Sequence, residues 1–197
     1  DPLWSRGLGD VYKRQHLEGP FLSPVQSGAQ SPGALCAPTP EISAALLDSW
    51  NGIRMMGAAP ELPGALELGD VLSSRGVAAS IAHSDADYDT CMEALRHGYS
   101  DVTHLYSGCS TVHRENGYRH GGVVESALLD DRFTVQVIAD GKHLPPELLR
   151  LIYKCKGSRR ISLITDALFP AGSPLREGQF VTCLLYTSPS PRDQRGS

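Results

Sequence analysis

The sequence predicts an α/β fold, a partial (β/α)8 TIM-type barrel with about six of the eight βα units of the complete fold. Short apolar runs alternate with segments of helical period, a pattern that is typical of a parallel sheet. Polar residues follow the apolar runs at their carboxyl ends, where such a barrel keeps its chemistry. A doubly wound open sheet would also place polar groups there, but no GxGxxG turn favours it.

The apolar runs predict five strands, at residues 53–58, 77–82, 102–105, 133–139 and 161–165. The HLEGP string of residues 16–20 adds a sixth, truncated strand. The polar residues at the strand ends are Glu61, His83, His104, Asp140, His143 and Asp166, with His104 expected inside its strand. These residues are therefore expected at one edge of the sheet, the barrel mouth.

Helical periodicity predicts five helices, at residues 40–49, 65–75, 88–97, 123–129 and 146–156. The last helix has Pro146 and Glu147 in its first turn and Lys154 and Lys156 in its last, as capping and dipole preferences favour. Residues 23–40 and 106–122 fit neither pattern and are expected to be long loops, which are often functional in compact domains.

Two stretches near the chain ends can be back-translated into reverse-complementary codons: residues 5–15 (SRGLGDVYKRQ) and 183–193 (CLLYTSPSPRD). No fold would impose this relation, which extends over about eleven codons, and such segments are set aside from fold reasoning. We therefore predict that residues 1–15 and 183–197 are translated sequencing adapter. Residues 16–182 are expected to be an internal part of a longer protein and to form the partial barrel.

Composition excludes several functional classes. The net charge of −4 and the pI of about 6.0 give no basic surface for nucleic acid. No apolar run approaches the ~20 residues that span a membrane. The cysteines outside the predicted adapter form no CxxC pair and are too sparse for a secreted disulfide scaffold, so we expect reduced thiols in a cytoplasmic protein.

Five short strings carry the candidate chemistry: HLEGP (16–20), IAHSDA (81–86), VTHLY (102–106), ADGKH (139–143) and LITDA (163–167). Each string is weak alone, because a histidine or aspartate at a strand end is often structural. Together they bring two imidazoles and two carboxylates to one barrel mouth, a set that suits a divalent metal with an open position for water.

In this order, and together with HLEGPFLSP and the APE of residues 59–61, the strings resemble the N-acetylglucosamine-6-phosphate deacetylase family of the amidohydrolase superfamily. The resemblance covers essentially all of residues 16–182. It implies that Glu18, His83 and His104 are metal ligands, that Asp166 is the catalytic acid/base, and that His143 contacts the acetamide. The implied substrate contacts are Ala29, Gln30, Ser107, Gly108, Arg114, Asp140, Gly141, Lys142 and His143.

The sequence departs from the family at some of these contacts. Gln30 stands where many members have histidine, Ser107 and Gly108 replace a common Asn-Ala pair, and the loop before Arg114 is one residue shorter. All of these departures concern sugar and phosphate contacts. The implied metal ligands follow the family pattern.

The resemblance implies metal-dependent hydrolysis of N-acetyl-D-glucosamine 6-phosphate to D-glucosamine 6-phosphate and acetate in amino-sugar catabolism. An amide is a poor electrophile, so the reaction needs a metal, zinc or iron here, that lowers the pKa of water from about 15.7 towards ~7. Asp166 would take the proton of the water and pass it to the departing amine. One or two metals per subunit, a homodimer, and Arg114 as the phosphate ligand are further implications.

Three other interpretations stay open. Another amidohydrolase, such as a deacylase or a cyclic amidase, often uses a carboxylated lysine; Lys142 is the one lysine at a strand end, and its neighbours argue against that role. A sugar-phosphate binding protein without catalysis would not need Asp166. The polypeptide as given is also expected to be an inactive, truncated product with open sheet edges.

Overall fold

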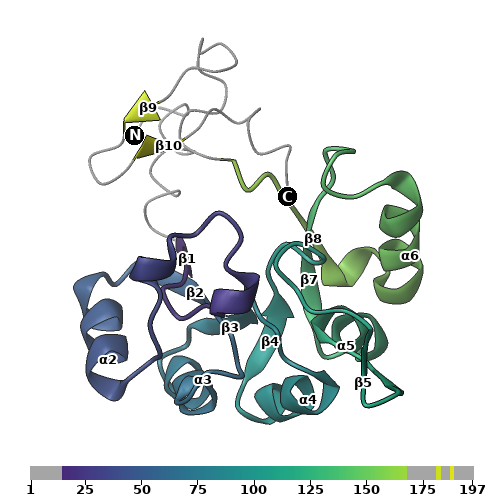
Figure 1. Ribbon diagram of the computed structural model, residues 1–197. Helices are drawn as coiled ribbons and strands as arrows, with labels where there is room; N and C mark the ends of the chain where they lie inside the picture. The colour runs from purple at the N-terminus through teal and green to yellow at the C-terminus, as the bar shows by residue number, and fades with distance from the viewer. Residues whose placement is uncertain (1–14, 168–180, 183–186, 189–197) are drawn as a thin grey trace. The chain divides into compact units, whose positions relative to one another are not determined.

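Six parallel strands form one sheet in the computed structural model, which describes residues 15–167, 181–182 and 187–188. The strand order is β1-β2-β3-β4-β7-β8, and every neighbouring pair is parallel (Figure 1). The strands are β1 (Gln15–Glu18), β2 (Ile53–Ala58), β3 (Ala78–Ile81), β4 (Tyr99–Val102), β7 (Thr134–Ile138) and β8 (Ile161–Ile164). The six-stranded parallel sheet fits a partial TIM-type α/β barrel, as predicted.

Five α-helices connect these strands and lie along one side of the sheet (Figure 1). They are α2 (Pro40–Ser49), α3 (Ala65–Ser74), α4 (Tyr88–Arg96), α5 (Val123–Leu129) and α6 (Pro146–Lys156), with short 3-10 turns η1 (Pro24–Gln26), η2 (Pro32–Ala34) and η3 (Ser158–Arg160). All five predicted helices are confirmed to within a residue at either end. Among the described residues, no helix is long and apolar enough to cross a membrane.

Side-chain caps explain where the helices begin and end. Thr39 accepts a hydrogen bond from the Ile42 amide at the start of α2, and Asp87 accepts one from the Thr90 amide at the start of α4. At the end of α5, the buried Nζ of Lys156 donates to the Asp130 carbonyl over 2.7 Å. The Lys156 cation gives a hydrogen-bond donor to a carbonyl that has no partner within the helix, and it interacts favourably with the negative end of the helix dipole.

The chain divides into two compact units at Ile164, and the parallel sheet lies in the first. The described residues of the second unit are 165–167 and an antiparallel pair, β9 (Val181–Thr182) and β10 (Thr187–Ser188). Most of the predicted adapter sequence, residues 1–14, 183–186 and 189–197, lies outside the described residues.

Strand β4 begins and ends three residues earlier than predicted, at Tyr99–Val102 rather than 102–105. An apolar run did not mark this strand, because it contains the polar residues Ser100 and Asp101. Asp101 is nevertheless buried, because its carboxylate accepts hydrogen bonds from Ser80 (2.9 Å), Thr134 (2.6 Å) and Gln136 (2.7 Å) on neighbouring strands. The expectation that His104 lies inside the strand was therefore wrong, since His104 follows the strand by two residues.

The segment 106–122, expected to be a loop without regular structure, contains an antiparallel hairpin. Its strands are β5 (His113–Glu115) and β6 (Tyr118–His120), joined by Asn116 and Gly117 with φ of 49° and 89°. Positive φ at both central residues is typical of the tight turn that Asn-Gly forms. The other predicted loop, 23–40, contains η1 and η2.

The hydrophobic core lies mainly between the sheet and its helices, where Met56, Ile81, Leu72 and Ile152 are buried. The opposite side of the sheet carries the polar groups around Asp101. Gln136 on β7 also donates to the sulfur of Met55 on β2 over 3.1 Å, although β7 is three places from β2 in the sheet. This contact requires the sheet to be strongly curled, as in a barrel.

Candidate metal centre

The three implied metal ligands come from the carboxyl ends of three strands. Glu18 is the last residue of β1, His83 follows β3 by two residues, and His104 follows β4 by two residues. Both histidines have positive φ, 44° at His83 and 29° at His104. Positive φ is uncommon for residues other than glycine and is enriched at functional sites, where the backbone aims a side chain.

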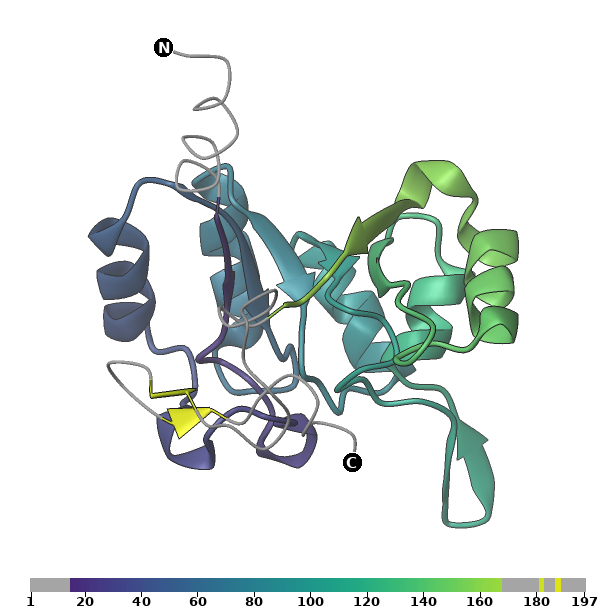
Figure 2. The same cartoon turned by 90° about the horizontal axis from the view of Figure 1, so that it is seen from above.

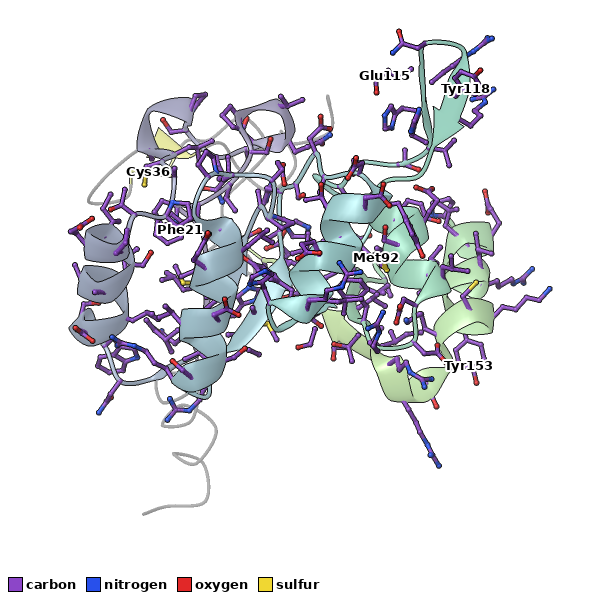
Figure 3. The ribbon with its side chains drawn as sticks, turned by 90° about the horizontal axis from the view of Figure 1, so that it is seen from below. Phe21, Cys36, Met92, Glu115, Tyr118 and Tyr153 are labelled. Atoms are coloured by element: carbon purple, nitrogen blue, oxygen red, sulfur yellow. The ribbon has the colours of Figure 1, made fainter. Side chains whose placement is uncertain are left out.

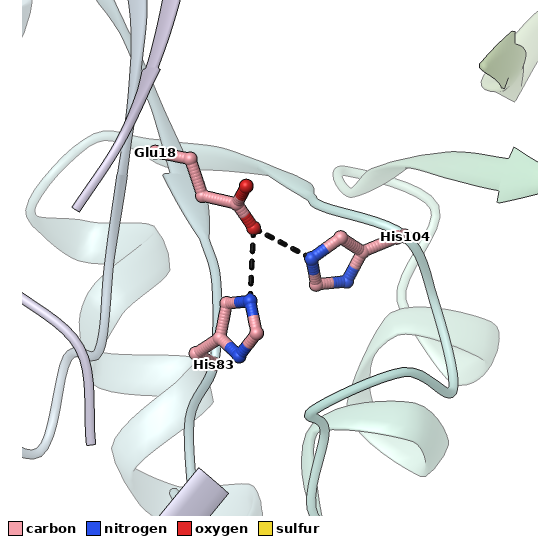
Figure 4. A group of neighbouring side chains, drawn as sticks. All are labelled: Glu18, His83 and His104. Carbon is pink, nitrogen blue, oxygen red and sulfur yellow. Dashed lines mark hydrogen bonds and ion pairs between the residues drawn. The ribbon is translucent and has the colours of Figure 1, made fainter. Parts of the chain in front are cut away.

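The three side chains meet at one carboxylate oxygen (Figure 4). Oε1 of Glu18 lies 2.9 Å from Nε2 of His83 and 2.6 Å from Nε2 of His104. The two imidazoles stand edge-on, with ring centroids 4.8 Å apart, and the three candidate ligand atoms lie within 4.8 Å of one another. One carboxylate and two imidazoles within this distance form a donor set that suits a divalent transition metal.

The second nitrogen of each ring faces a backbone carbonyl. Nδ1 of His83 lies 2.7 Å from the Gln26 carbonyl, and Nδ1 of His104 lies 2.9 Å from the Ser107 carbonyl. A neutral histidine that donates from Nδ1 to a carbonyl presents its Nε2 lone pair, which is the state that a metal ligand needs. The residues present therefore fit a metal at this position.

The electrostatics of the cluster favour positive charge between the residues. Burial alone would raise the pKa of Glu18, but hydrogen bonds to His104 and His83 outweigh it and hold the pKa well below its usual range. Burial alone would lower the pKa of His104, but hydrogen bonds to Cys109 and Glu18 raise it to about 10. The carboxylate thus draws a proton or a metal cation to this point.

Glu61, at the mouth end of β2, holds the loop that carries His83. Its Oε2 accepts from Ser84 Oγ over 2.7 Å and its Oε1 from the Asp85 amide over 2.6 Å. The backbone of Ser84 in turn bonds to Gly108 and Ser110 in the loop after His104. The two histidine-bearing loops are therefore joined to each other. The sequence placed Glu61 at the mouth but gave no sign of this role.

The loops that carry four predicted substrate contacts approach the cluster. A Cβ at Gly28 would lie 3.2 Å from Cε1 of His83, and a Cβ at Gly108 would lie 2.6 Å from its Nδ1. Gly108 also has φ of 55°, so a glycine suits this position in both space and backbone conformation. Ala29, Gln30 and Ser107 adjoin these glycines in the sequence.

The Asp140–His143 turn follows β7 and is exposed. Oδ1 of Asp140 accepts from the amides of Lys142 and His143, and Oδ2 lies 2.9 Å from Nδ1 of His143. These hydrogen bonds hold the pKa of Asp140 below its usual range, and the bond from the His143 amide has the largest effect. Gly141 has φ of 72° within the turn. In the described chain, no hydrogen bond joins His143 to Glu18, His83 or His104.

The remaining two predicted site residues are Arg114 and Asp166. Arg114 lies on β5 and is exposed, and its Nε donates to the Gly117 carbonyl over 3.3 Å. Asp166 follows β8 by two residues, has φ of 47°, and belongs to the second unit of the chain. Its catalytic role stays a prediction.

Comparison with known proteins identifies relatives. N-Acetylglucosamine-6-phosphate deacetylase of Bacillus subtilis (strain 168) is 36% identical over 170 residues, which are 84% of the chain and 40% of that protein. N-Acetylgalactosamine-6-phosphate deacetylase of Shewanella sp. (strain ANA-3) is 32% identical over 183 residues, 92% of the chain and 45% of that protein. No family model matches the chain.

Solved structures agree with these relatives. A variant of N-acetyl-D-glucosamine-6-phosphate deacetylase from Mycobacterium smegmatis, in complex with N-acetyl-D-glucosamine-6-phosphate, has a TM-score of 0.75 and 35% sequence identity. The match covers 80% of this chain and 40% of that one. The curled parallel sheet and the names of these relatives place the chain among the amidohydrolase barrels. The chain belongs to the N-acetylglucosamine-6-phosphate deacetylase family, and it spans about two fifths of the length of the curated relatives it matches.

Proposed function

We propose that this chain is the metal-binding part of an enzyme that hydrolyses N-acetyl-D-glucosamine 6-phosphate to D-glucosamine 6-phosphate and acetate in amino-sugar catabolism. The cluster of Glu18, His83 and His104 carries the proposal, because strings far apart in the sequence supply a metal-binding donor set at the mouth of a deacetylase-like barrel. The names of the relatives support the substrate class.

In this proposal, Glu18, His83 and His104 hold one divalent cation, zinc or iron. An ion bound there would supply Lewis acidity, which polarises a carbonyl group and lowers the pKa of water. With Nδ1 donating to the Gln26 or Ser107 carbonyl, each histidine would have its Nε2 lone pair available to hold the ion. A second metal in the same subunit would need ligands besides these three.

Asp166 accepts the proton of the attacking water and then protonates the departing nitrogen, so that the general base becomes the general acid. His143 donates a hydrogen bond to the oxygen on which negative charge develops, a contribution typically worth about 2.7 to 4 kcal/mol. Asp140 positions this imidazole, since its two oxygens hold both the amide and Nδ1 of His143. The ring then presents Nε2 for catalysis.

Two phosphorylated sugars are candidate substrates. Relatives named for N-acetylgalactosamine 6-phosphate are 32% and 33% identical to the chain, close to the 36% of the Bacillus subtilis enzyme. The two sugars share the acetamide and the 6-phosphate and differ in the configuration of one hydroxyl. N-Acetylgalactosamine 6-phosphate is therefore the second candidate substrate, for the same chemistry.

We further propose a cytoplasmic homodimer. The cysteines outside the predicted adapter are sparse and form no CxxC pair, a pattern that favours a reducing compartment. Arg114 lies on the exposed β5–β6 hairpin, which extends away from the sheet (Figure 2), and this position supports a role at the site of a neighbouring subunit. Alone, the chain is expected to be inactive and prone to aggregation, because Leu163 on the edge strand β8 is 74% exposed.

The test uses the full-length parent gene, in which native sequence replaces residues 1–15 and 183–197, the regions that we infer to be adapter. Acetate release is measured from both phosphorylated sugars and from unphosphorylated N-acetylglucosamine, before and after chelation and metal restoration. We expect the highest kcat/KM on N-acetylglucosamine 6-phosphate and an activity that chelation removes and zinc or iron restores. Activity that persists without metal, or a preference for a different amide, would contradict the proposal.

A further inference from the structure

The β5–β6 hairpin presents different chemistry on its two faces. Residues pair across it as His113 with His120, Arg114 with Arg119, and Glu115 with Tyr118. Side chains alternate between the faces of a strand, so Arg114 and Arg119 share one face and the other two pairs share the opposite one. Figure 3 shows Glu115 and Tyr118 beside the turn. Arg119 was not among the residues that the sequence suggested.

The face opposite the arginines lines a cavity of about 650 Å³. His113, Glu115 and His120 form its hairpin wall, and Glu61, Asp85 and Asp87 lie among the other lining residues. Among the described residues that line this cavity there is no lysine or arginine. The hairpin thus separates an acidic cavity from a basic outer face, and an anion is favoured on the arginine face alone.

Two arginines directly opposite each other repel, and like charges at such positions destabilise a hairpin. In the described chain neither guanidinium has a carboxylate partner, and Arg114 bonds only to the Gly117 carbonyl. Of the other described arginines, Arg75, Arg96, Arg132 and Arg160 each pair with an acidic side chain, whereas Arg54, Arg150 and Arg159 do not. The Asn116–Gly117 turn nevertheless fixes the register that keeps the two arginines together.

We infer that Arg114 and Arg119 together bind one phosphate monoester dianion, and that Arg119 is a specificity-determining residue for phosphorylated sugars. A guanidinium offers a planar fork of donors that matches phosphate oxygens, and two forks on one face can share its three terminal oxygens. A dianion there also removes the repulsion between the two arginines. The inference rests on the proposed function, because the phosphate it places is that of the substrate.

The kinetic test compares Arg119→Ala, Arg119→Lys and Arg114→Ala in the full-length enzyme. Arg150→Ala is the matched control, since Arg150 is an exposed arginine on α6. Charge-assisted hydrogen bonds are strong enough that Arg119→Ala should lower kcat/KM for the phosphorylated sugar by about 10-fold or more. The unphosphorylated sugar should be unaffected, and lysine should restore part of the loss because it keeps charge but not the fork.

A binding measurement keeps this inference separate from the proposed reaction. Calorimetry with inorganic phosphate should show weaker binding for Arg119→Ala and Arg114→Ala than for wild type and Arg150→Ala. The double variant should lose less than the sum of both single losses if one phosphate contacts both residues. The enzyme could deacetylate neither sugar and still bind phosphate in a way that depends on both arginines. That result would contradict the proposed function but support the anion site. Phosphate binding and sugar selectivity that are the same in Arg119→Ala and Arg150→Ala would overturn the inference.

Discussion

The imidazoles of the Glu18–His83–His104 cluster are buried and have a partner at each ring nitrogen, whereas the arginines of the β5–β6 hairpin are exposed and have a backbone partner or none. The cluster needs three strands in the correct order and two loops joined to each other. The hairpin needs a two-residue turn and its own short strands. Changes in the cluster should therefore remove metal and all activity, while changes in the hairpin should alter only which substrate is preferred.

The largest expected effect comes from His104→Ala in the full-length enzyme. Loss of an outer partner of a ligand typically costs 10- to 100-fold in metal affinity, so loss of the ligand itself should cost more than about 100-fold. Metal content after dialysis and acetate release should both fall towards background. His97→Ala, at a partly exposed histidine beyond α4, is the control and should keep both. A His104→Ala enzyme that retains stoichiometric metal would remove His104 from the ligand set.

Asp166→Asn should separate catalysis from metal binding. We expect turnover to fall about 100-fold or more, as for loss of a general acid/base, with metal content unchanged. Metal analysis and steady-state rates on the same preparation provide the measurement. An Asn variant that is fully active would exclude Asp166 from proton transfer, and one without metal would instead make it a ligand.

Glu61→Gln should weaken metal binding by the cluster, although Glu61 is not one of its three residues. The amide nitrogen of glutamine cannot accept one of the two hydrogen bonds that now come from Ser84 and the Asp85 amide. We expect metal affinity to fall by about 10-fold, with the ratio of rates on phosphorylated and unphosphorylated sugar unchanged. Glu67→Gln, at an exposed position on α3, is the control. A changed sugar ratio with normal metal affinity would show that the cluster and the specificity residues are not separable in this way.

The smallest effect concerns pH and His97, which lies outside both regions. A hydrogen bond to Asp70 raises the pKa of His97, with further help from nearby carboxylates. A raised folded-state pKa stabilises the protein fully below the unfolded value of about 6.5, and this contribution is lost as pH rises through the folded pKa. His97→Gln should therefore lower Tm more at acidic than at alkaline pH. The corresponding loss in the free energy of unfolding should be less than about 1 kcal/mol, because the pair is exposed. An equal Tm difference at both pH values would rule out this ion pair.

Local signals made the helices and most strands predictable. Thr39, Asp87 and Pro146 mark helix starts, and β2 is an apolar run that the structure reproduces in full. Strand β4 was misplaced because Asp101 is buried through partners on other strands, which local composition cannot reveal. The hairpin was missed because its six strand residues are exposed and polar, which left the Asn116–Gly117 dipeptide as the one signal.

The site shows the same division. The strings at the strand ends were enough to predict which three residues form the cluster. That the two imidazoles meet at one oxygen of Glu18 depends on the order of the strands in the folded sheet. The bonds from Glu61 to Ser84 and Asp85 join residues more than twenty positions apart. Such contacts depend on the folded sheet, and nothing in the local sequence marks them. The alternation that pairs Arg114 with Arg119 could have been inferred once the turn was recognised.

The hydrogen bond from Gln136 to Met55 spans the concave side of a sheet that has two outer strands, β1 and β8. The curvature of the six strands is thus already present without a closed ring. Strands added beside β1 or β8 would need to match these two hydrogen-bonding edges, but they would not need to impose the bend. The edge that carries Glu18, His83 and His104 is thus shaped by strands that this segment already contains.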